Sequence, residues 1–546
     1  MSDAAAKSTV HDWASPEAKR NLRRRYAADR RLQFYGLAAI GLAILLLGIL
    51  VVSLISTGYT AFVQTKMELQ VFLDPKRIDP AKPRAGNYRL IVRDSFLKLF
   101  PDVTSRSEKR ALGRILSTEV RFLVRDYVVA NPSAIGKTVT LVVPLSDPFD
   151  QLHKNVIPSE VEALTRREKR RFGMLVNRNV VSVEDGRTLV QIDAFIDPGK
   201  VDREDIADGD FDAIAKEGFR AYFPREGGTA MFAILAPNAA DAVREHVVEN
   251  PTSIGKTVQV KVPVSEHYAT LNAGQTPKIT NPRFASTEQV KAFEDLVEKG
   301  LVSTPFNWEL FFNSDSRFPE QAGLAGAITG SFYTLLVCFL ISFPVGIAAA
   351  VYLEEFAPKN RATDLIEVNI NNLAAVPSVV FGLLGLAVFL GVFGLPRSAP
   401  LVGGMVLSLM TLPTIIIATR AALKAVPPSI REAALGVGAS KHQVMLHHVL
   451  PLAMPGILTG TIIGLAQALG ETAPLLLIGM NAFITSPPGG ILEPATALPT
   501  QIYSWADSPE RGFVARTSAA ILVLLGFLVV MNAVAIFLRQ RFERKW

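Results

Sequence analysis

The feature that most constrains this chain is a set of six apolar segments, each long enough to cross a lipid bilayer. A helix needs roughly 20 predominantly apolar residues to span the hydrocarbon core. The predicted spans cover residues 32–57, 323–353, 367–394, 399–420, 456–480 and 514–538. The first is longer than the apolar core of a cleaved signal peptide, so we expect it to stay in the protein. With 49% hydrophobic residues, the chain is predicted to be an all-α polytopic membrane protein.

Basic residues flank one side of these spans and predict the topology, because cytoplasmic loops carry an excess of lysine and arginine. Residues 1–31 form a polar, basic tail that we expect to be disordered and cytoplasmic. The other flanking residues are Lys359, Arg361, Lys424, Arg431, Lys441, Arg539, Arg541, Arg544 and Lys545. Both termini and residues 421–455 are therefore predicted to be cytoplasmic. The net charge of +7 reflects these topology signals, so we expect no nucleic-acid partner.

Residues 58–318 lie on the opposite side in this topology and read as a large inserted α/β domain. This domain repeats itself: Phe72-Leu73-Asp74-Pro75 returns as Phe195-Ile196-Asp197-Pro198, and 131–139 resembles 250–258. We predict two similar subdomains, at about 67–150 and 190–270. The single cysteine, Cys338, excludes a disulfide within the chain and a thiolate metal cluster.

The extramembrane repeat contains a sequence close to a phosphate-binding P-loop, Asn131-x4-Gly136-Lys137-Thr138. A P-loop leads from a strand into a helix, whereas an apolar strand is expected to follow this sequence, so we reject nucleotide binding. ATP chemistry must then come from another chain. We find no nucleophile–base pair, so no catalytic residues are assigned. For His442, His447 and His448, a solvated or partner-facing surface is favoured over a metal site.

A short polar stretch between the fourth and fifth spans is predicted to form a rigid helix. Pro427 and Pro428 suit a helix start, where no backbone donor is needed. Glu432 is expected in the first turn, and Ala433 and Ala434 are expected to keep the surface flat. Gly436 and Gly438 are expected to interrupt the helix and to leave room for a close neighbour. A soluble partner could bind such an element and transmit its movement.

Polar residues inside the predicted spans are the candidates for a transport pathway, since polar groups are costly in lipid. Asn371 and Asn372 precede Pro377-Ser378, and Gly470-Glu471-Thr472 is expected to break the fifth span near its middle. Arg420 ends the fourth span, where it either contributes charge to a pathway or contacts lipid phosphates. Glu471 is either a pathway residue or a structural partner between helices.

Two groups of residues carry a resemblance to a known family. Glu432-Ala433-Ala434 with Gly438 and Leu450-Pro451 resembles the EAA loop of bacterial ABC importer permeases, although His448 departs from an apolar position. Gly470-Glu471-Thr472-Ala473-Pro474 is similar to phosphate permeases of the PstA type. The resemblance covers the first span and about residues 320–546, and residues 58–318 are an insertion. It implies a type I permease fold for residues 319–546.

The resemblance also implies partners. These are a homologous phosphate permease, two ATPase subunits that carry ATP and Mg²⁺, and a periplasmic phosphate-binding protein, all at a bacterial inner membrane. The chain itself would bind no cofactor and no metal. The ATPase-coupling residues implied are Arg431, Glu432, Ala433, Ala434, Gly438, Leu450 and Pro451. The substrate-pathway candidates are Asn371, Asn372, Pro377, Ser378, Arg420, Gln467, Glu471 and Thr472.

Departures from the family pattern leave alternatives open. Gln467 lies near a position where many relatives carry an arginine, so Arg420 is the remaining cation near the route. Glu471 would repel an anion, so we expect it to be paired with a cation or protonated. A permease for sulfate or molybdate, and a subunit that senses phosphate or docks a partner, are the competing functions.

Overall fold

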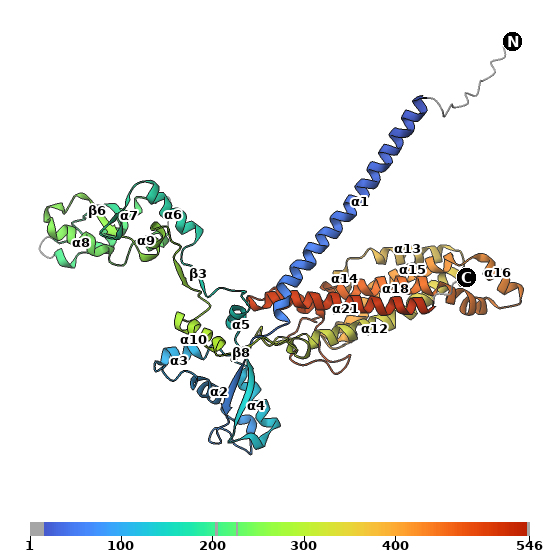
Figure 1. Ribbon diagram of the computed structural model, residues 1–546. Coiled ribbons are helices and arrows are strands. Elements are labelled where there is room, and N and C mark those ends of the chain that lie inside the picture. The colour runs from blue at the N-terminus through green and yellow to red at the C-terminus, as the bar shows by residue number, and fades with distance from the viewer. Residues whose placement is uncertain (1–15, 203–205, 225, 227, 543–546) are drawn as a thin grey trace, which may run out of the picture. The chain divides into compact units, whose positions relative to one another are not determined.

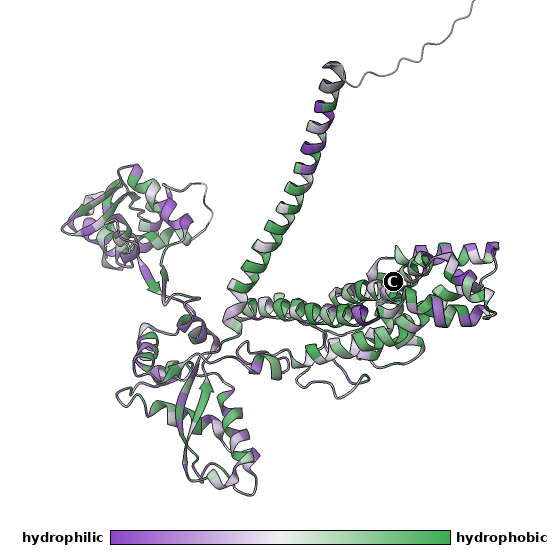
Figure 2. Ribbon diagram, turned by 45° about the vertical axis from the view of Figure 1, so that its right-hand side comes forward, coloured by the Kyte–Doolittle hydropathy of each residue, from purple (hydrophilic) through white to green (hydrophobic). Residues whose placement is uncertain are grey.

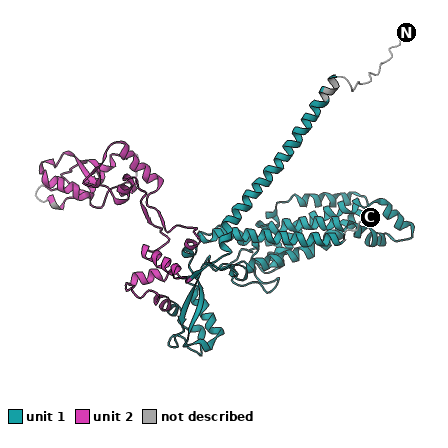
Figure 3. Cartoon of the chain, in the orientation of Figure 1, with its two compact units in different colours: residues 1–92, 116–150, 302–546 teal, residues 93–115, 151–301 magenta. Residues whose placement is uncertain are grey.

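The computed structural model describes residues 16–202, 206–224, 226 and 228–542, and the chain divides into two compact units (Figure 3). Unit 1 comprises residues 1–92, 116–150 and 302–546. Unit 2 comprises residues 93–115 and 151–301. Unit 1 therefore contains all the predicted spans together with part of the inserted region, and unit 2 contains the remainder of the insertion.

The described part of unit 1 has five helices long and apolar enough to cross a membrane (Figure 1). A sixth candidate is a pair of helices bent by 103°. The five are α1 (Pro16–Gly58), α12 (Ala325–Val351), α15 (Pro400–Ala425), α18 (Leu450–Gly470) and α21 (Gly512–Phe542). The bent pair is α13 (Arg361–Ala374) and α14 (Ser378–Leu384), which continues as a π-helix, Gly385–Val392.

Three expectations need correction. The third span is not one helix over 367–394, because Pro377 is extended (ψ 139°) and starts a new helix direction. The predicted helix break at Gly470-Glu471-Thr472 is confirmed, but it lies at the end of α18 rather than in the middle of a span. Residues 16–31 are helical and not a disordered tail, since no glycine or proline interrupts the start of α1 after Pro16. Residues 1–15 of the predicted tail lie outside the described residues. Figure 2 shows this first part of α1 as hydrophilic and the rest as hydrophobic.

Small residues allow the bundle helices to approach closely, as is common between membrane helices. A Cβ on Gly404 of α15 would lie 2.5 Å from Val337 of α12. A Cβ on Gly460 of α18 would lie 2.1 Å from the Cβ of Ala418 of α15. These contacts pack α12, α15 and α18 side by side (Figure 1).

The extramembrane part of unit 1 is built on a three-stranded sheet of order β2-β1-β8. Its strands are β1 (Lys66–Phe72), β2 (Thr138–Pro144) and β8 (Val302–Ser303). Burial alternates along β1, so one face of the sheet packs on a core that includes the inner face of α4 (Val120–Ala130). The short helix α11 (Glu309–Phe312) completes this region, and α2 (Tyr88–Leu97) and α5 (Asp147–His153) each have residues in both units.

Unit 2 contains a second three-stranded sheet, of order β4-β5-β6, and a two-stranded ladder β3-β7. Phe172, Phe219 and Tyr268 are buried in its core. The strands are β3 (Glu160–Glu162), β4 (Val181–Glu184), β5 (Arg187–Phe195), β6 (Thr257–Pro263) and β7 (Lys278–Thr280). The helices are α3 (Arg106–Leu112), α6 (Arg166–Asn177), α7 (Phe211–Arg220), α8 (Ala239–Glu249), α9 (Glu266–Asn272) and α10 (Thr287–Glu298).

The two repeated sequences occupy equivalent places in the two sheets. Phe72 of β1 lies opposite Thr138 of β2, and Phe195 of β5 lies opposite Thr257 of β6. Both pairs are antiparallel and run for seven residues in the same relative register. A helix followed by an Asn-Pro turn leads into the second strand in each copy.

The sequence that resembles a P-loop is this turn. Gly136 and Gly255 both have φ of +86°, a left-handed conformation that favours glycine. Each donates its backbone N–H across 2.8 Å, to the carbonyl of Leu73 or of Ile196 respectively. The lysine that follows leads into a strand, which is the wrong continuation for a phosphate-binding loop.

Candidate functional site

The stretch between α15 and α18 forms a short helix, α16 (Pro428–Gly436), at the largely hydrophilic end of the bundle (Figure 2). Pro427 caps it and Pro428 is its first residue, as predicted. Glu432 falls just after the first turn, which contains no acidic residue. The helix ends at Gly436, and Gly438 has a φ of +89° that reverses the chain. Ser440 then caps α17 (Lys441–Gln443), and a π-helix (Val444–Val449) leads into Leu450 of α18.

One face of α16 packs onto the ends of α15 and α18. Ala434 is buried, and Ile430 is partly buried against the same apolar cluster. That cluster also contains Leu423, Val426, Val444, Met445, Val449, Ala453 and Ile457, with Leu450 packed against it. The two alanines predicted to keep the surface flat therefore lie on different sides of α16: Ala434 faces the bundle and Ala433 faces outward. Pro451, at the start of α18, is half-buried.

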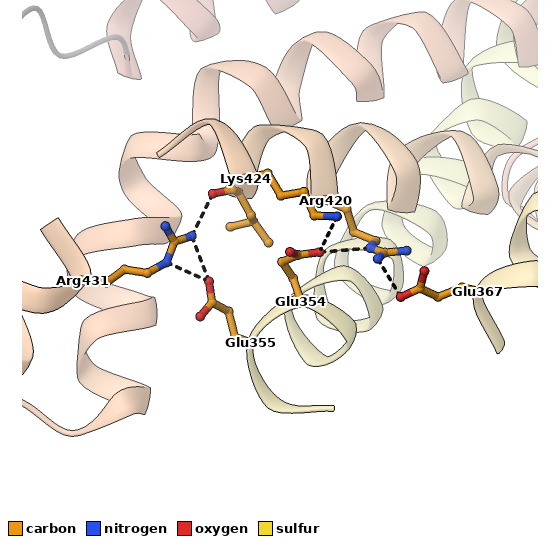
Figure 4. Close-up of polar contacts among 7 residues, drawn as sticks. Glu354, Glu355, Glu367, Arg420, Lys424 and Arg431 are labelled. Atoms are coloured by element: carbon orange, nitrogen blue, oxygen red, sulfur yellow. Dashed lines mark hydrogen bonds and ion pairs between the residues drawn. The ribbon is translucent and has the colours of Figure 1, made fainter. Parts of the chain in front are cut away.

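Arg431 points toward the bundle and fixes α16 to two other helices (Figure 4). Its Nε and Nη2 donate to Oε1 of Glu355 at 3.1 and 2.9 Å. Glu355 belongs to the π-helix (Tyr352–Phe356) that ends α12. Nη1 and Nη2 also donate to the carbonyls of Val426 and Leu423, each at 2.8 Å. These carbonyls lie at the C-terminus of α15, which leaves acceptors without a partner in the helix.

A second ion-pair network lies beside the first (Figure 4). The guanidinium of Arg420 lies 3.3 Å from a carboxylate oxygen of Glu354 and 2.7 Å from one of Glu367. Lys424 lies 3.5 Å from the same oxygen of Glu354. Because these residues come from the π-helix that ends α12, from α13 and from α15, the network connects three helical segments. Two carboxylates therefore offset much of the positive charge that the sequence suggested Arg420 would offer to a substrate.

The outward face of α16 is exposed and partly apolar. Val437 is 85% exposed and Leu435 is 47% exposed, beside the exposed Glu432 and Ala433. These two side chains give the outward face of α16 exposed apolar area. His442, His447 and His448 are exposed nearby. Among the described residues, no group of three or more His, Cys, Asp or Glu side chains is placed to hold a metal ion.

Two helix breaks meet inside the bundle, and several predicted pathway residues lie at them. Pro377 and Ser378 lie at the start of α14. Glu471 and Thr472 separate α18 from α19 (Ala473–Leu477). A Cβ on Gly382 of α14 would lie 2.7 Å from the Cα of Pro474 in α19, so the helices that follow the two breaks are in direct contact.

The pathway candidates differ in exposure and in position. Asn371, Asn372 and Gln467 are exposed, whereas Ser378, Glu471 and Thr472 are half-buried. Exposed amides on membrane helices are expected to face a cavity or a partner subunit, because lipid does not satisfy their hydrogen bonds.

Arg420 does not join this group. Close contacts of Gly456 with Ala422 and of Gly460 with Ala418 place it beside the first half of α18. Glu471 lies more than ten residues further along, roughly 20 Å at 1.5 Å per residue.

Sequence reasoning missed the acidic partners Glu354, Glu355 and Glu367. A signal for two of them was readable, because Glu354 and Glu355 are adjacent carboxylates at the end of an apolar segment. Such groups need a cation close by when they are partly buried. The identity of that cation depends on which helices pack together, and this information is absent from the local sequence.

Residues 342–546 match the family described as binding-protein-dependent transport system inner membrane component. Residues 19–163 and 186–280 match a domain of unknown function, DUF3333. The chain is 32% identical to the phosphate transport system permease protein PstA of Haemophilus influenzae, over 46% of this chain and 86% of that protein. It is 28% identical to the probable ABC transporter permease protein YqgI of Bacillus subtilis, over 47% of this chain and 90% of that protein. A solved inward-facing MetNI methionine ABC transporter covers 40% of this chain at 18% identity and a TM-score of 0.32.

Proposed function

Because this chain belongs to the family of ABC importer permeases that includes the PstA phosphate permeases, we propose that it forms part of a phosphate pathway across the bacterial inner membrane. It is a transport subunit and not an enzyme. In this proposal a homologous permease pairs with it, a periplasmic protein delivers phosphate, and a separate ATPase dimer supplies ATP and Mg²⁺. The relatives named as phosphate permeases support phosphate over sulfate or molybdate.

The observation that carries the proposal is the two-sided construction of α16. Its outward face presents Leu435 and Val437, and its inward face is held by Arg431. A rigid-body movement of α16 would pass through Glu355 to α12 and through the C-terminal turn of α15 to the rest of the bundle. This is the connection required if ATP binding by another chain is to favour one conformation of the permease.

The route for phosphate is proposed to lie at the two adjoining helix breaks. Asn371, Asn372, Ser378 and Thr472 supply hydrogen-bond donors, and helix ends at a break add backbone N–H groups. Glu471 must be neutral or paired there, with a cation of the partner permease as one source. Uptake by a Glu471→Gln variant at normal complex abundance tests this role, and wild-type transport would remove it.

The inserted region, residues 58–318, is proposed to be periplasmic and to descend from an internal duplication. The matched strand register and the matched left-handed glycines support the duplication. The number of crossings supports this topology. Four spans, namely α1, α12, the bent pair and α15, separate the start of α1 from α16 and leave them on one side, whereas three separate the insertion from α16 and place these on opposite sides. A cysteine-reactive, membrane-impermeant label at introduced sites in the insertion and in α16 would distinguish the two sides.

The test of coupling is a substitution on the exposed face of α16. We expect Val437→Asp to abolish co-purification with the ATPase, since it places a charge where an apolar contact is proposed. Val437 is 85% exposed, so the fold of the permease should be unaffected. The matched control is Lys359→Gln, an exposed residue before α13 and outside α16. Full ATPase binding by Val437→Asp would show that the docking surface lies elsewhere.

A further inference from the structure

A run of aromatic rings in unit 1 is exposed although it lies next to the bundle core. Phe306, Trp308 and Phe312 are 45%, 63% and 73% exposed. The ring centroids of Phe306 and Trp308 are 4.8 Å apart, and those of Trp308 and Phe312 are 6.3 Å apart. We call these three residues the aromatic cluster. Isolated exposed apolar residues are ordinary, but a contiguous aromatic group of this kind indicates a surface that is covered in the working protein.

The aromatic cluster continues inward to buried residues. Phe306 stacks on Phe311 at 6.2 Å between centroids, and Phe311 stacks on Phe62 at 6.1 Å. Phe62 and Phe311 pack against a buried group that includes Leu324, Phe513 and Trp505. The exposed rings are therefore the outer layer of a packed structure, and they are not side chains on a free loop.

Hydrogen bonds fix the segment at the end of the first membrane helix. The fully buried Asn307 donates its backbone N–H to the carbonyl of Phe62 at 2.7 Å and its Nδ2 to Ala61 at 2.9 Å. The N–H of Gln64 donates to the carbonyl of Pro305 at 3.0 Å. Ala61, Phe62 and Gln64 directly follow α1, which ends at Gly58.

The same segment is fixed at the start of α12. The N–H of Leu324 donates to the carbonyl of Leu310 at 2.7 Å, and the N–H of Ala325 to that of Asn313 at 2.9 Å. Phe513, in the first turn of α21, packs into the same group as Leu310. Ends of three membrane helices, α1, α12 and α21, therefore meet at the aromatic cluster. Helix ends of this kind mark the boundary between the hydrocarbon core and water.

The short helix α11 has two chemically different sides at this boundary. Glu309 forms an ion pair with Lys66 of β1 at 2.6 Å, while Trp308 and Phe312 present exposed rings. Tryptophan is enriched at membrane interfaces because its ring is apolar and its N–H is polar. The charged side is directed to the extramembrane sheet, so the aromatic side is the one available to lipid.

We propose that the aromatic cluster inserts into the lipid headgroup region, on the side of the membrane opposite to α16. It would thereby hold sheet β2-β1-β8 at a fixed height above the bilayer, since β1 follows Gln64 directly and is ion-paired to α11. The occupant is phospholipid, because the ends of three membrane helices already place the rings at the lipid boundary.

The proposal is tested by fluorescence of the full-length chain in phosphatidylcholine nanodiscs. Subtracting the emission of a Trp308→Phe variant isolates Trp308 from the buried Trp505 and the other tryptophans. We expect the difference emission to be blue-shifted. Lipids brominated near the headgroup should quench it more strongly than lipids brominated deep in the acyl chain, and more strongly than aqueous iodide.

Two results would overturn the proposal. Strong quenching by iodide with none by brominated lipid would place the ring in water. Quenching by neither reagent would mean that protein covers the cluster. Trp308→Phe is a conservative change at an exposed site, so it should leave the fold intact. The emission that remains in this variant, which includes that of buried Trp505, serves as the internal reference in every lipid.

Discussion

At the scale of single residues, Arg431 and Glu355 form the contact on which the proposed transmission from α16 depends. Arg431 donates to Glu355 and to two backbone carbonyls, so the pair is not symmetrical. Removing the arginine leaves the Glu355 carboxylate and two carbonyls without this donor. Removing the carboxylate leaves the two hydrogen bonds from Arg431 to the carbonyls in place. Hydrogen bonds to charged groups contribute about 1.5–3 kcal/mol when partly buried.

We therefore expect Arg431→Gln to lower the thermal stability of the purified chain more than Glu355→Gln does. Both variants should reduce ATP-driven transport while keeping ATPase binding, since neither side chain belongs to the outward face of α16. Lys424→Gln is the control, because Lys424 is 60% exposed and 3.5 Å from Glu354. Equal effects of Arg431→Gln and Glu355→Gln would mean that the carbonyl contacts contribute nothing.

Glu320 is a buried carboxyl group outside the membrane helices and gives a pH prediction. It accepts a hydrogen bond from Ser117 at 2.7 Å, which acts to lower its pKa, but burial acts more strongly and the pKa is raised. The folded state therefore binds its proton more tightly than the unfolded state. Its contribution to stability is present below the ordinary pKa of 4.5 and is lost as the pH rises through the raised folded-state value.

We expect the melting temperature of the detergent-solubilised chain to fall as the pH rises above about 4.5, by an amount that Glu320→Gln removes. The quantity to compare is the difference between wild type and variant at each pH, because other groups titrate in both. Ser117→Ala serves as a second variant and should enlarge the wild-type pH dependence. A wild-type minus variant difference that does not change with pH would contradict the assignment.

At the scale of elements, the turn after α16 requires a left-handed backbone conformation at Gly438. Gly438 has a φ of +89°, where any other L-residue is strained by about 1 kcal/mol or more. Gly436 is helical with open space around it. We expect Gly438→Ala to weaken coupling and Gly436→Ala to be neutral or slightly stabilising. ATPase co-purification and thermal stability measure both, and equal behaviour of the two variants would refute this account of the turn.

Because Gly438 is left-handed, an acidic substitution at this position would not test the docking surface alone. Gly438→Asp would alter the chain conformation as well as adding bulk and charge, so its failure to couple would not identify the docking surface. Val437→Asp keeps an ordinary backbone conformation and tests the surface alone.

Hydrophobicity made the positions of most membrane helices predictable, and the two prolines made the start of α16 predictable. Apolar length and proline or glycine position are local properties, and the structure follows them closely from Pro427 to Gly438. The bend of 103° at Pro377 was not predicted, although the proline was noted. Whether a proline kinks a helix or divides it depends on the neighbours available to each half, here the contact of Gly382 with Pro474.

The ion pairs of Arg420 and Arg431 were unpredictable for the same reason. Each joins residues more than fifty positions apart, and the choice among nearby carboxylates is made by helix packing. The exposure of Val437 against the burial of Ala434 also follows only once α16 is placed on the bundle.

At the scale of the whole molecule, the membrane helices and the inserted region were predictable from different sequence patterns, namely apolar length and an internal repeat. The repeat was readable because the paired strands and their turns use nearly the same residues twice. The division of the repeat between the two units was not predictable. Residues 67–92 and 116–150 of the first copy belong to unit 1 with the membrane helices, whereas residues 93–115 and the whole second copy belong to unit 2. The segment 305–313 gives a physical reason why β1 and β8 belong to unit 1, because its hydrogen bonds and the Lys66–Glu309 ion pair connect it to the ends of α1 and α12 and to β1.

The central claim is that this chain passes phosphate across the membrane under the control of an ATPase bound at α16. The direct measurement is uptake of labelled phosphate by proteoliposomes containing the chain, its partner permease and the ATPase, with binding protein outside and ATP inside. We predict uptake that requires ATP, is competed by unlabelled phosphate but not by sulfate or molybdate, and is abolished by Val437→Asp. Uptake without ATP, or equal competition by sulfate, would contradict the account.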